Sequence, residues 1–244
     1  FSFDLEAFDR LVSSRTRLVV LNSPGNPTGG VMPLAALEHI AEAAKRFDFW
    51  VISDEIYSRL VYESPAPSIA DLPGMAERTV VCDGFSKTYA MTGWRLGYGI
   101  MPAALAERVE LLLTHSIGCT ASFTQVAGLR AVRGPQQPVD AMVAEYRRRR
   151  DVLVAGLNAI PGVTCRMPQG AFYAFPNITA FGRNSEWMAD YLLEHAGVAV
   201  LPGTAFGAGG EGYLRICFAN SMEKISQAVV SMDEALRRLK RRQD

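Results

Sequence analysis

Short apolar runs alternate with helical patterns along the first hundred residues, and this alternation constrains the fold more than any other feature of the sequence. Between the first two runs, residues 33–47 carry apolar side chains at helical spacing, and Pro33 suits the first turn of a helix. Strand–helix–strand order with continuously apolar strands is typical of a mainly parallel sheet that is buried on both faces. The sequence therefore predicts an α/β fold. The predicted strands are residues 17–22, 49–53, 79–82 and 96–101.

The second half of the chain has a different pattern. Residues 102–132 are predicted to be helical, and a Gly- and Pro-containing break at 134–138 precedes a long helix over 139–159. Short strands and further helices follow, which is typical of a smaller α+β domain. These are strands at 163–166, 171–175 and 213–218 and helices at 185–196 and 221–240. We expect a partial large domain at 1–138, a connecting helix at 139–160 and a small C-terminal domain at 161–244.

The composition excludes several classes of protein. The 244 residues include 25 Lys and Arg against 25 Asp and Glu, so the formal net charge is zero, and 49% are hydrophobic. Intrinsic disorder needs low hydrophobicity and high net charge, and a nucleic-acid-binding surface needs a basic excess. No apolar run approaches the roughly 18 residues that indicate a membrane-spanning helix. We therefore expect a globular protein with no nucleic-acid or membrane partner.

The arginine run at residues 147–150 and the cysteines have ordinary interpretations. The run is flanked by Glu145 and Asp151 in a neutral chain, which indicates a solvated helix face. The cysteines are too scattered for a zinc or redox motif, so we expect no metal site but buried, reduced thiols in a cytoplasmic protein. They are Cys82, Cys119, Cys165 and Cys217.

Polar residues follow three of the predicted strands. Because ligands of open α/β sheets bind beyond the carboxyl ends of the strands, such residues can converge on one pocket. Taken singly, the stretch around Asn26 is explained as a turn and the stretch around Asp54 as a helix cap. A lysine directly after a buried strand, with an arginine eight residues further on, is harder to explain by structure alone. The residues are Asn26 after the first strand, Asp54 and Tyr57 after the second, and Ser86, Lys87 and Arg95 after the third.

These residue types match the needs of pyridoxal phosphate. This cofactor requires a lysine for its aldehyde, an acid at its pyridinium nitrogen, donors near its ring hydroxyl and a cationic site for its phosphate. In the surrounding stretches the chain resembles the fold-type I pyridoxal phosphate enzymes, in particular the class I/II aminotransferases related to aspartate and tyrosine aminotransferases. The matching stretches are residues 22–29, 53–57, 84–98 and 212–219, with a weaker match at 168–175.

The resemblance implies a role for each cofactor-binding residue. Lys87 would form a Schiff base with the cofactor and, once released, move a proton between the substrate α-carbon and the cofactor. Asp54 would pair with the pyridinium nitrogen, while Asn26 and Tyr57 would donate to the ring 3′-oxygen. Arg95 would bind the phosphate, because a guanidinium offers paired hydrogen bonds. Lys87, Asp54 and Tyr57 are the catalytic residues in this scheme.

The resemblance also implies a substrate-binding pair. Arg215 would clamp the α-carboxylate of the substrate, with Asn26 as the second substrate-binding residue. Arg215 lies in a predicted strand whose neighbours Leu214 and Ile216 point the other way, so its guanidinium can leave the core.

The chain departs from the family pattern in two places. Many relatives have a phosphate-binding serine three residues before the lysine, where this chain has Gly84, and Ser86 is expected to compensate. Relatives also have an N-terminal third or more before the strand at 17–22. The chain therefore resembles the C-terminal part of an aminotransferase, and we expect it to be inactive alone and to expose apolar surface. The residues expected to be exposed are Val19, Leu21, Val51 and Val81.

The expected activity is transfer of an amino group from an L-amino acid to a 2-oxo acid by a ping-pong mechanism, in a homodimer. A β-lyase on the same scaffold would keep Asp54, Lys87 and Arg215, because fold alone does not fix the reaction. A third reading is an aminotransferase-like effector domain of a transcription regulator, but such domains typically have an aromatic residue where this chain has Asn26. The side-chain specificity stays open between aspartate, aromatic, alanine and branched-chain substrates.

Overall fold

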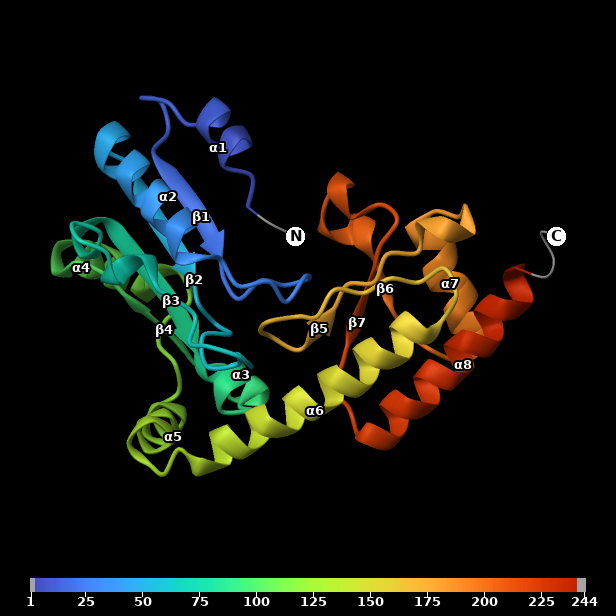
Figure 1. Cartoon of the computed structure of the whole chain (residues 1–244). Coiled ribbons are helices and arrows are strands. Elements are labelled where there is room, and N and C mark those ends of the chain that lie inside the picture. The colour runs from blue at the N-terminus through green and yellow to red at the C-terminus, as the bar shows by residue number, and fades with distance from the viewer. Residues whose placement is uncertain (1–2, 241–244) are drawn as a thin grey trace. The chain divides into compact units, whose positions relative to one another are not determined.

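The computed structural model describes residues 3–240 and divides the chain into two compact units, each of which is described by itself (Figure 1). Among the described residues, unit 1 contains residues 3–24 and 30–141, and unit 2 contains residues 25–29 and 142–240. The short segment 25–29 therefore belongs to unit 2, although unit 1 flanks it in the sequence.

The centre of unit 1 is a four-stranded sheet in the order β1-β2-β3-β4. β1, β2 and β3 are parallel, which confirms the mainly parallel sheet, and β4 runs antiparallel to β3. Asn22, Asp54 and Cys82 are aligned across the parallel strands, so the carboxyl ends of these strands share one edge. The strands are β1 (Leu18–Asn22), β2 (Trp50–Asp54), β3 (Thr79–Gly84) and β4 (Gly97–Ile100).

One face of this sheet packs against α2 (Leu34–Phe47), the helix predicted at 33–47 (Figure 1). Ile40 and Ala44 of α2 are fully buried in one apolar cluster with Val51 of β2. The helix begins directly after Pro33 and ends at Asp48, whose φ of 54° is left-handed. The apolar stripe of α2 and alternate positions of β1 and β2 therefore form the core of unit 1.

The opposite face of the sheet is open, which corrects the expectation of a sheet buried on both faces. Leu18 and Val20 of β1 are 48% and 65% exposed, and Trp50 of β2 is 37% exposed. The four residues expected to be exposed are instead buried or half-buried, because they occupy the alternate positions on the covered face. These are Val19, Leu21, Val51 and Val81.

The predicted helical stretch 102–132 forms two helices, because the chain turns at Gly118, whose φ of 76° is left-handed. Both helices leave large apolar side chains exposed, including Ile117 at 80% and Phe123 at 72%. A short helix before β1, capped by Asp4, lies outside the predicted elements. The three helices are α1 (Leu5–Leu11), α4 (Ala103–Ser116) and α5 (Ser122–Arg133), and short 3₁₀ turns are η1 (Ile69–Asp71), η2 (Ala76–Arg78) and η3 (Thr92–Trp94).

Unit 2 combines short antiparallel strands, in the order β5-β7-β6, with helices. The long helix α6 (Gln137–Ala159) agrees with the predicted helix at 139–159, and α7 and α8 agree with the other two. The predicted strand at 163–166 is reduced to an isolated bridge between Thr164 and Asn177. The remaining elements are β5 (Tyr173–Ala174), η4 (Thr179–Phe181), α7 (Ser185–Ala196), β6 (Leu201–Pro202), η5 (Gly203–Phe206), η6 (Ala208–Gly210), β7 (Leu214–Cys217) and α8 (Met222–Lys240).

The arginine run in α6 is only partly solvated, which corrects the sequence interpretation. Arg150 is 3% exposed, and its guanidinium donates to the carbonyl oxygen of Pro168 at 2.8 Å and to Asp151 at 2.9 Å. A buried cation needs such partners, because burial removes its hydration. Arg149 instead pairs with Glu145 one turn away, as expected on a helix surface. Arg150 therefore ties the loop at Pro168 to α6.

Candidate functional site

The sheet edge where β1, β2 and β3 end carries the first group of predicted residues. Asp54 is the last residue of β2, and its Oδ1 accepts a hydrogen bond from the backbone N–H of Ile56 at 3.2 Å. This contact closes a tight turn that leads from the strand into the segment of Tyr57. Nδ2 of Asn22 donates to the carbonyl oxygen of Asp54 at 3.4 Å, so the ends of β1 and β2 are joined here.

Lys87 lies in α3 (Phe85–Thr88), a short helix that begins directly after β3. Its Nζ is 5.7 Å from the centre of the Tyr57 ring. Lys87 and Tyr57 belong to segments that follow different strands, and the parallel sheet brings them together. Ser86 precedes Lys87 in α3 and is half-buried.

The lack of a side chain at Gly84 has a steric reason. Gly84 is the last residue of β3 and caps α3. A Cβ at this position would lie 3.1 Å from the carbonyl oxygen of Leu96 and 3.2 Å from Cα of Gly97. Both are backbone atoms at the start of β4, and they can move aside only by disturbing the β3–β4 pair. The close approach of the chain at Leu96 and Gly97 therefore disfavours a side chain at this position, including the serine expected from the family resemblance.

Arg95 follows η3 in a left-handed conformation, with φ of 51°. Its Nη1 donates to the carbonyl oxygen of Thr92 at 2.8 Å, and the residue is otherwise exposed. Together with Trp94, Ile117 and Phe123 it lines a hollow of about 730 Å³. A guanidinium at the wall of an open hollow suits an anionic group.

Glu55, the neighbour of Asp54, has a structural role at this edge that the sequence does not reveal. Its Oε1 accepts hydrogen bonds from the hydroxyls of Ser53 at 2.9 Å and Ser68 at 2.6 Å. Desolvation raises the pKa of the Glu55 carboxyl above its usual value, and the two hydroxyls oppose this shift. The Glu55 carboxyl therefore serves to fix the chain around the end of β2.

Asp83 is a second such residue, and it joins two of the segments at this edge. Its Oδ2 accepts hydrogen bonds from the hydroxyls of Tyr98 at 3.2 Å and Ser58 at 3.4 Å, and its Oδ1 accepts one from the N–H of Gly84 at 2.6 Å. Ser58 follows Tyr57, and Gly84 precedes α3. Burial raises the pKa of the Asp83 carboxyl, and burial with the adjacent Asp83 charge raises the pKa of Tyr98 to about 12.

In unit 2, Arg215 lies in β7 between two core residues. Leu214 and Ile216 are buried whereas Arg215 is half-buried, which is the alternation that the sequence predicts. Nη1 of Arg215 donates to Oδ1 of Asn26 at 3.1 Å, although 189 positions separate the two residues in the sequence. The structure therefore brings together the two residues implied in substrate binding.

Asn26 is held in place because its segment docks within unit 2. The carbonyl oxygen of Gly29 accepts the N–H groups of Gln169 at 2.8 Å and Gly170 at 2.9 Å. Gly29 has a φ of 66°, and a Cβ there would collide with the side chain of Pro168. Only glycine both adopts a positive φ readily and lacks the Cβ that would collide here, so the turn after β1 requires glycine at position 29.

The guanidinium of Arg215 packs against two aromatic rings. Its Cζ is 4.6 Å from the centre of the Tyr173 ring and 4.9 Å from that of Phe206. Its Nε is buried and has no hydrogen-bond acceptor among residues 3–240. Within the same range, no carboxylate forms an ion pair with Arg215. A buried donor that lacks an acceptor calls for an explanation, and an anionic ligand supplies one.

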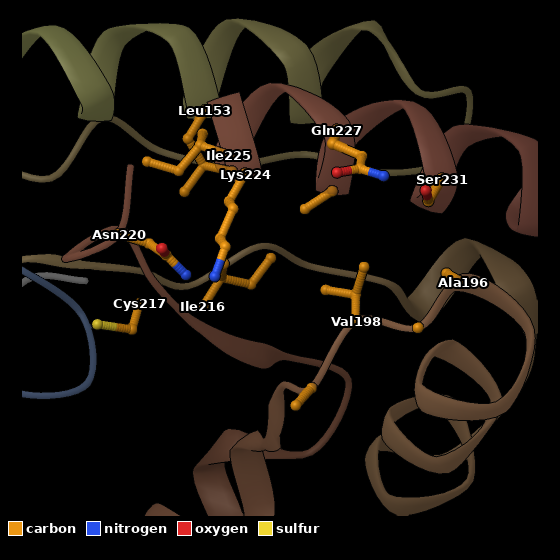
Figure 2. Close-up of a pocket in the computed structure, with 13 residues that line it drawn as sticks. Leu153, Ala196, Val198, Ile216, Cys217, Asn220, Lys224, Ile225, Gln227 and Ser231 are labelled. Carbon is orange, nitrogen blue, oxygen red and sulfur yellow. The ribbon is translucent and has the colours of Figure 1, made fainter. Parts of the chain in front are cut away.

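A cavity of about 460 Å³ elsewhere in unit 2 is lined by none of the candidate cofactor- or substrate-binding residues. Leu153 of α6, Val198 after α7 and Lys224 of α8 contribute to its lining (Figure 2). Figure 2 shows the Lys224 side chain extending between Asn220 and Ile216. The cavity is therefore separate from the group around Arg215.

The part of the chain that the structure describes contains no group of three or more His, Cys, Asp or Glu residues that could hold a metal ion. Cys165 is buried, and desolvation raises the pKa of its thiol to about 11. Cys119 and Cys217 are exposed and Cys82 is half-buried, which corrects the expectation of buried thiols. In residues 3–240, no helix has the length and apolarity needed to cross a membrane.

The fold and these residues agree with a known family. The model of the family described as aminotransferase class I and II matches residues 1–232. The chain belongs to this family, which confirms the resemblance found in the sequence motifs.

Individual relatives are aminotransferases of several kinds. The chain is 42% identical to an aspartate aminotransferase of Pyrococcus horikoshii, covering 92% of this chain and 58% of the relative. It is 38% identical to an arginine–pyruvate transaminase of Pseudomonas aeruginosa, covering 93% of this chain and 58% of the relative. Among solved structures, the aromatic aminotransferase of Pyrococcus horikoshii OT3 superposes with a TM-score of 0.95 at 40% identity, over 98% of this chain and 65% of that one. The chain thus spans about six tenths of the length of these relatives.

The residues at the sheet edge of unit 1 fit the pyridoxal phosphate that this family implies. The cofactor needs an amine, a carboxylate and a hydroxyl donor around its ring. Lys87 in α3, Asp54 at the end of β2 and Tyr57 beside Lys87 supply these three groups from one edge of the sheet. The exposed guanidinium of Arg95 adds a cation suited to a phosphate.

Proposed function

We propose that the protein is a pyridoxal phosphate-dependent aminotransferase that moves an amino group from an L-amino acid to a 2-oxo acid in a ping-pong cycle. The observation that carries this proposal is the 5.7 Å approach of Lys87 Nζ to the Tyr57 ring at the sheet edge where β2 ends in Asp54. Membership of the family supports it, as do relatives named aspartate aminotransferase and arginine–pyruvate transaminase. The homodimer and the cytoplasmic location implied by the resemblance belong to the same proposal.

In this proposal the residues of unit 1 hold the cofactor. Lys87 would hold the cofactor through its aldehyde group, Asp54 would stabilise a proton at its ring nitrogen, and the Tyr57 hydroxyl would donate to its ring oxygen. Arg95 and Ser86 bind the phosphate. When bound, the cofactor supplies a protonated ring that accepts electrons from the substrate α-carbon. Lys87 also acts as the base that moves the α-proton.

The residues of unit 2 bind the substrate. Arg215 donates paired hydrogen bonds to the α-carboxylate, a role that its lack of an acidic partner within residues 3–240 supports. Oδ1 of Asn26 accepts from Arg215, and Nδ2 of the same amide would be the donor that the resemblance implies for the ring oxygen. Asn26 and Arg215 therefore form a hydrogen-bonded pair within unit 2.

Product analysis tests this reaction against the β-lyase alternative. In the full-length protein, an L-amino acid alone is expected to give at most one equivalent of 2-oxo acid per bound cofactor, because transamination needs an acceptor for the amino group. Continuous turnover should need a second 2-oxo acid as acceptor. Quantifying 2-oxo acid and ammonia over time checks both points. Sustained release of pyruvate together with ammonia, without any acceptor, would show that the enzyme is a lyase.

The variant Arg215→Lys tests the carboxylate-binding role. Lysine keeps the charge but loses the paired hydrogen bonds, which are worth about 1.5–3 kcal/mol when charge-assisted. We expect the KM of every L-amino acid to rise about 10- to 100-fold, and the reaction of an amine without a carboxylate to be unchanged. Steady-state kinetics measure both, with Arg183→Lys, an exposed arginine of the same unit, as the control. Equal losses for amino acids and amines would contradict the assignment.

A further inference from the structure

We propose that Phe206 is a positioning residue, which together with Tyr173 fixes the Arg215 guanidinium in the orientation that receives a carboxylate. The inference rests on the proposed carboxylate-binding role of Arg215. It adds a residue that the sequence motifs do not single out, since Phe206 lies in η5, outside all of the matching stretches.

The contacts of Arg215 are unusual for a half-buried cation. Its charge is not neutralised by a carboxylate within residues 3–240, and its Nη1 donates to the neutral amide oxygen of Asn26. Its Cζ instead lies 4.6 Å from the Tyr173 ring centre and 4.9 Å from the Phe206 ring centre. Aromatic rings stabilise a cation without neutralising it. The rings can therefore order the guanidinium while its charge stays available to an anion, which an aspartate at either position would not allow.

The Phe206 ring has a defined place because its loop is anchored. β6, which precedes η5, pairs with β7, and Leu201 of β6 lies opposite Arg215. Gly203, the first residue of η5, approaches Gly210 so closely that a Cβ at Gly203 would collide with the carbonyl oxygen of Gly210. This contact fixes the start of the loop against its end. The ring of Phe206 also meets the Phe175 ring edge-on, at 6.4 Å between ring centres.

The two aromatic rings that contact Arg215 differ in how strongly their replacement would disturb the core of unit 2. Tyr173 is buried in β5, so its replacement would disturb the core of unit 2. Phe206 is half-buried at the end of a surface loop. A change at Phe206 can therefore remove one ring from Arg215 while the unit stays folded, which makes Phe206 the informative position.

The test follows the Nε–H signal of Arg215 by NMR in the isotope-labelled chain. Sodium propionate, a carboxylate without an amino group, is titrated into the wild type, and propionamide serves as the uncharged comparison. Wild type is expected to show a saturable shift of the Arg215 signal with propionate and none with propionamide. In Phe206→Leu the propionate Kd is expected to rise about 5- to 20-fold, because one cation–ring contact is lost. The free-state signal should also move, since a ring current is removed.

Two further variants separate positioning from general packing. Phe206→Tyr keeps the ring and is expected to restore the wild-type Kd. Trp187→Leu removes another ring–guanidinium contact of unit 2, in which Arg183 Cζ lies 4.8 Å from the Trp187 ring, and is expected to leave the propionate Kd and the Arg215 signal unchanged. In the enzyme, Phe206→Leu should raise the KM of L-amino acids and leave kcat and amine reactions unchanged.

The outcomes distinguish this inference from the function on which it rests. If Phe206→Leu binds propionate as tightly as wild type, Phe206 does not position Arg215, and the carboxylate role of Arg215 stands. If Phe206→Tyr is as weak as Phe206→Leu, the ring is not the reason for the effect, and the inference is also overturned. If propionate does not shift the Arg215 signal in wild type, the carboxylate role itself is wrong and the inference is wrong with it.

Discussion

In the full-length protein, replacement of Lys87 by alanine is expected to reduce amino-group transfer by about 10⁴-fold or more and to abolish the visible absorbance of the lysine-bound cofactor. Lys87 supplies both the amine that bonds the aldehyde and the base that moves the α-proton, so one change removes two contributions. Absorbance spectra and steady-state rates of the purified variant measure the two effects.

Two companion variants make this result specific. Lys87→Arg is expected to be as inactive as the alanine variant, because a guanidinium keeps the charge but cannot be deprotonated to act as nucleophile or base. Lys45→Ala removes a lysine of α2 that pairs with Glu42 and should retain wild-type rates and spectra. A Lys87→Ala protein that transaminates at the wild-type rate would refute the assignment of Lys87.

The second large effect is expected at Asp54. Asp54→Asn should lower kcat by about 10²- to 10³-fold while cofactor binding is partly retained, because a neutral amide no longer stabilises a proton at the ring nitrogen. The loss should appear in the rate of α-proton removal, which deuterium at the substrate α-carbon makes measurable. A rise in KM with unchanged kcat would place Asp54 in binding alone.

The neighbouring acid provides a matched control for Asp54. Glu55→Gln removes a carboxyl one position along the chain, but its Oε1 can still accept the hydrogen bonds from Ser53 and Ser68. We expect this variant to keep kcat within a few-fold of wild type. If Glu55→Gln lowers kcat as much as Asp54→Asn does, activity depends on negative charge anywhere at this edge and not on the Asp54 carboxylate in particular.

The fold of unit 1 could be predicted because its signals are local. Apolar runs define the parallel strands, the helical spacing at 33–47 defines α2, and the order of these elements implies one shared edge for the strand ends. Because Tyr57 and Lys87 both follow strands that end at this edge, their proximity could be predicted without knowledge of long-range contacts. The covered face of the sheet was assigned wrongly, since continuously apolar strands do not reveal that Leu18 and Val20 are the exposed residues of β1.

The site in unit 2 depends on contacts that the sequence does not encode locally. Asn26 and Arg215 lie 189 positions apart, and only the family resemblance implied a common role for them. The rings around Arg215 come from β5 and η5, and no spacing rule relates these segments to β7. The contact of Arg150 was equally unpredictable, because a run of arginines in a helix does not indicate which of them will donate a hydrogen bond to the carbonyl oxygen of Pro168. Tertiary packing decides such contacts.

Reductive trapping tests the central claim most directly. The sequence contains four lysines, Lys45, Lys87, Lys224 and Lys240, so the position of a bound pyridoxal phosphate can be read from peptide masses. Borohydride treatment of the protein with equimolar cofactor, followed by proteolysis and mass spectrometry, fixes the cofactor to the amine that it bonds. The predicted result is a pyridoxyl group on the peptide containing Lys87, abolished by Lys87→Arg and retained by Lys45→Ala. Labelling spread over the other three lysines, or labelling that persists in Lys87→Arg, would contradict the account.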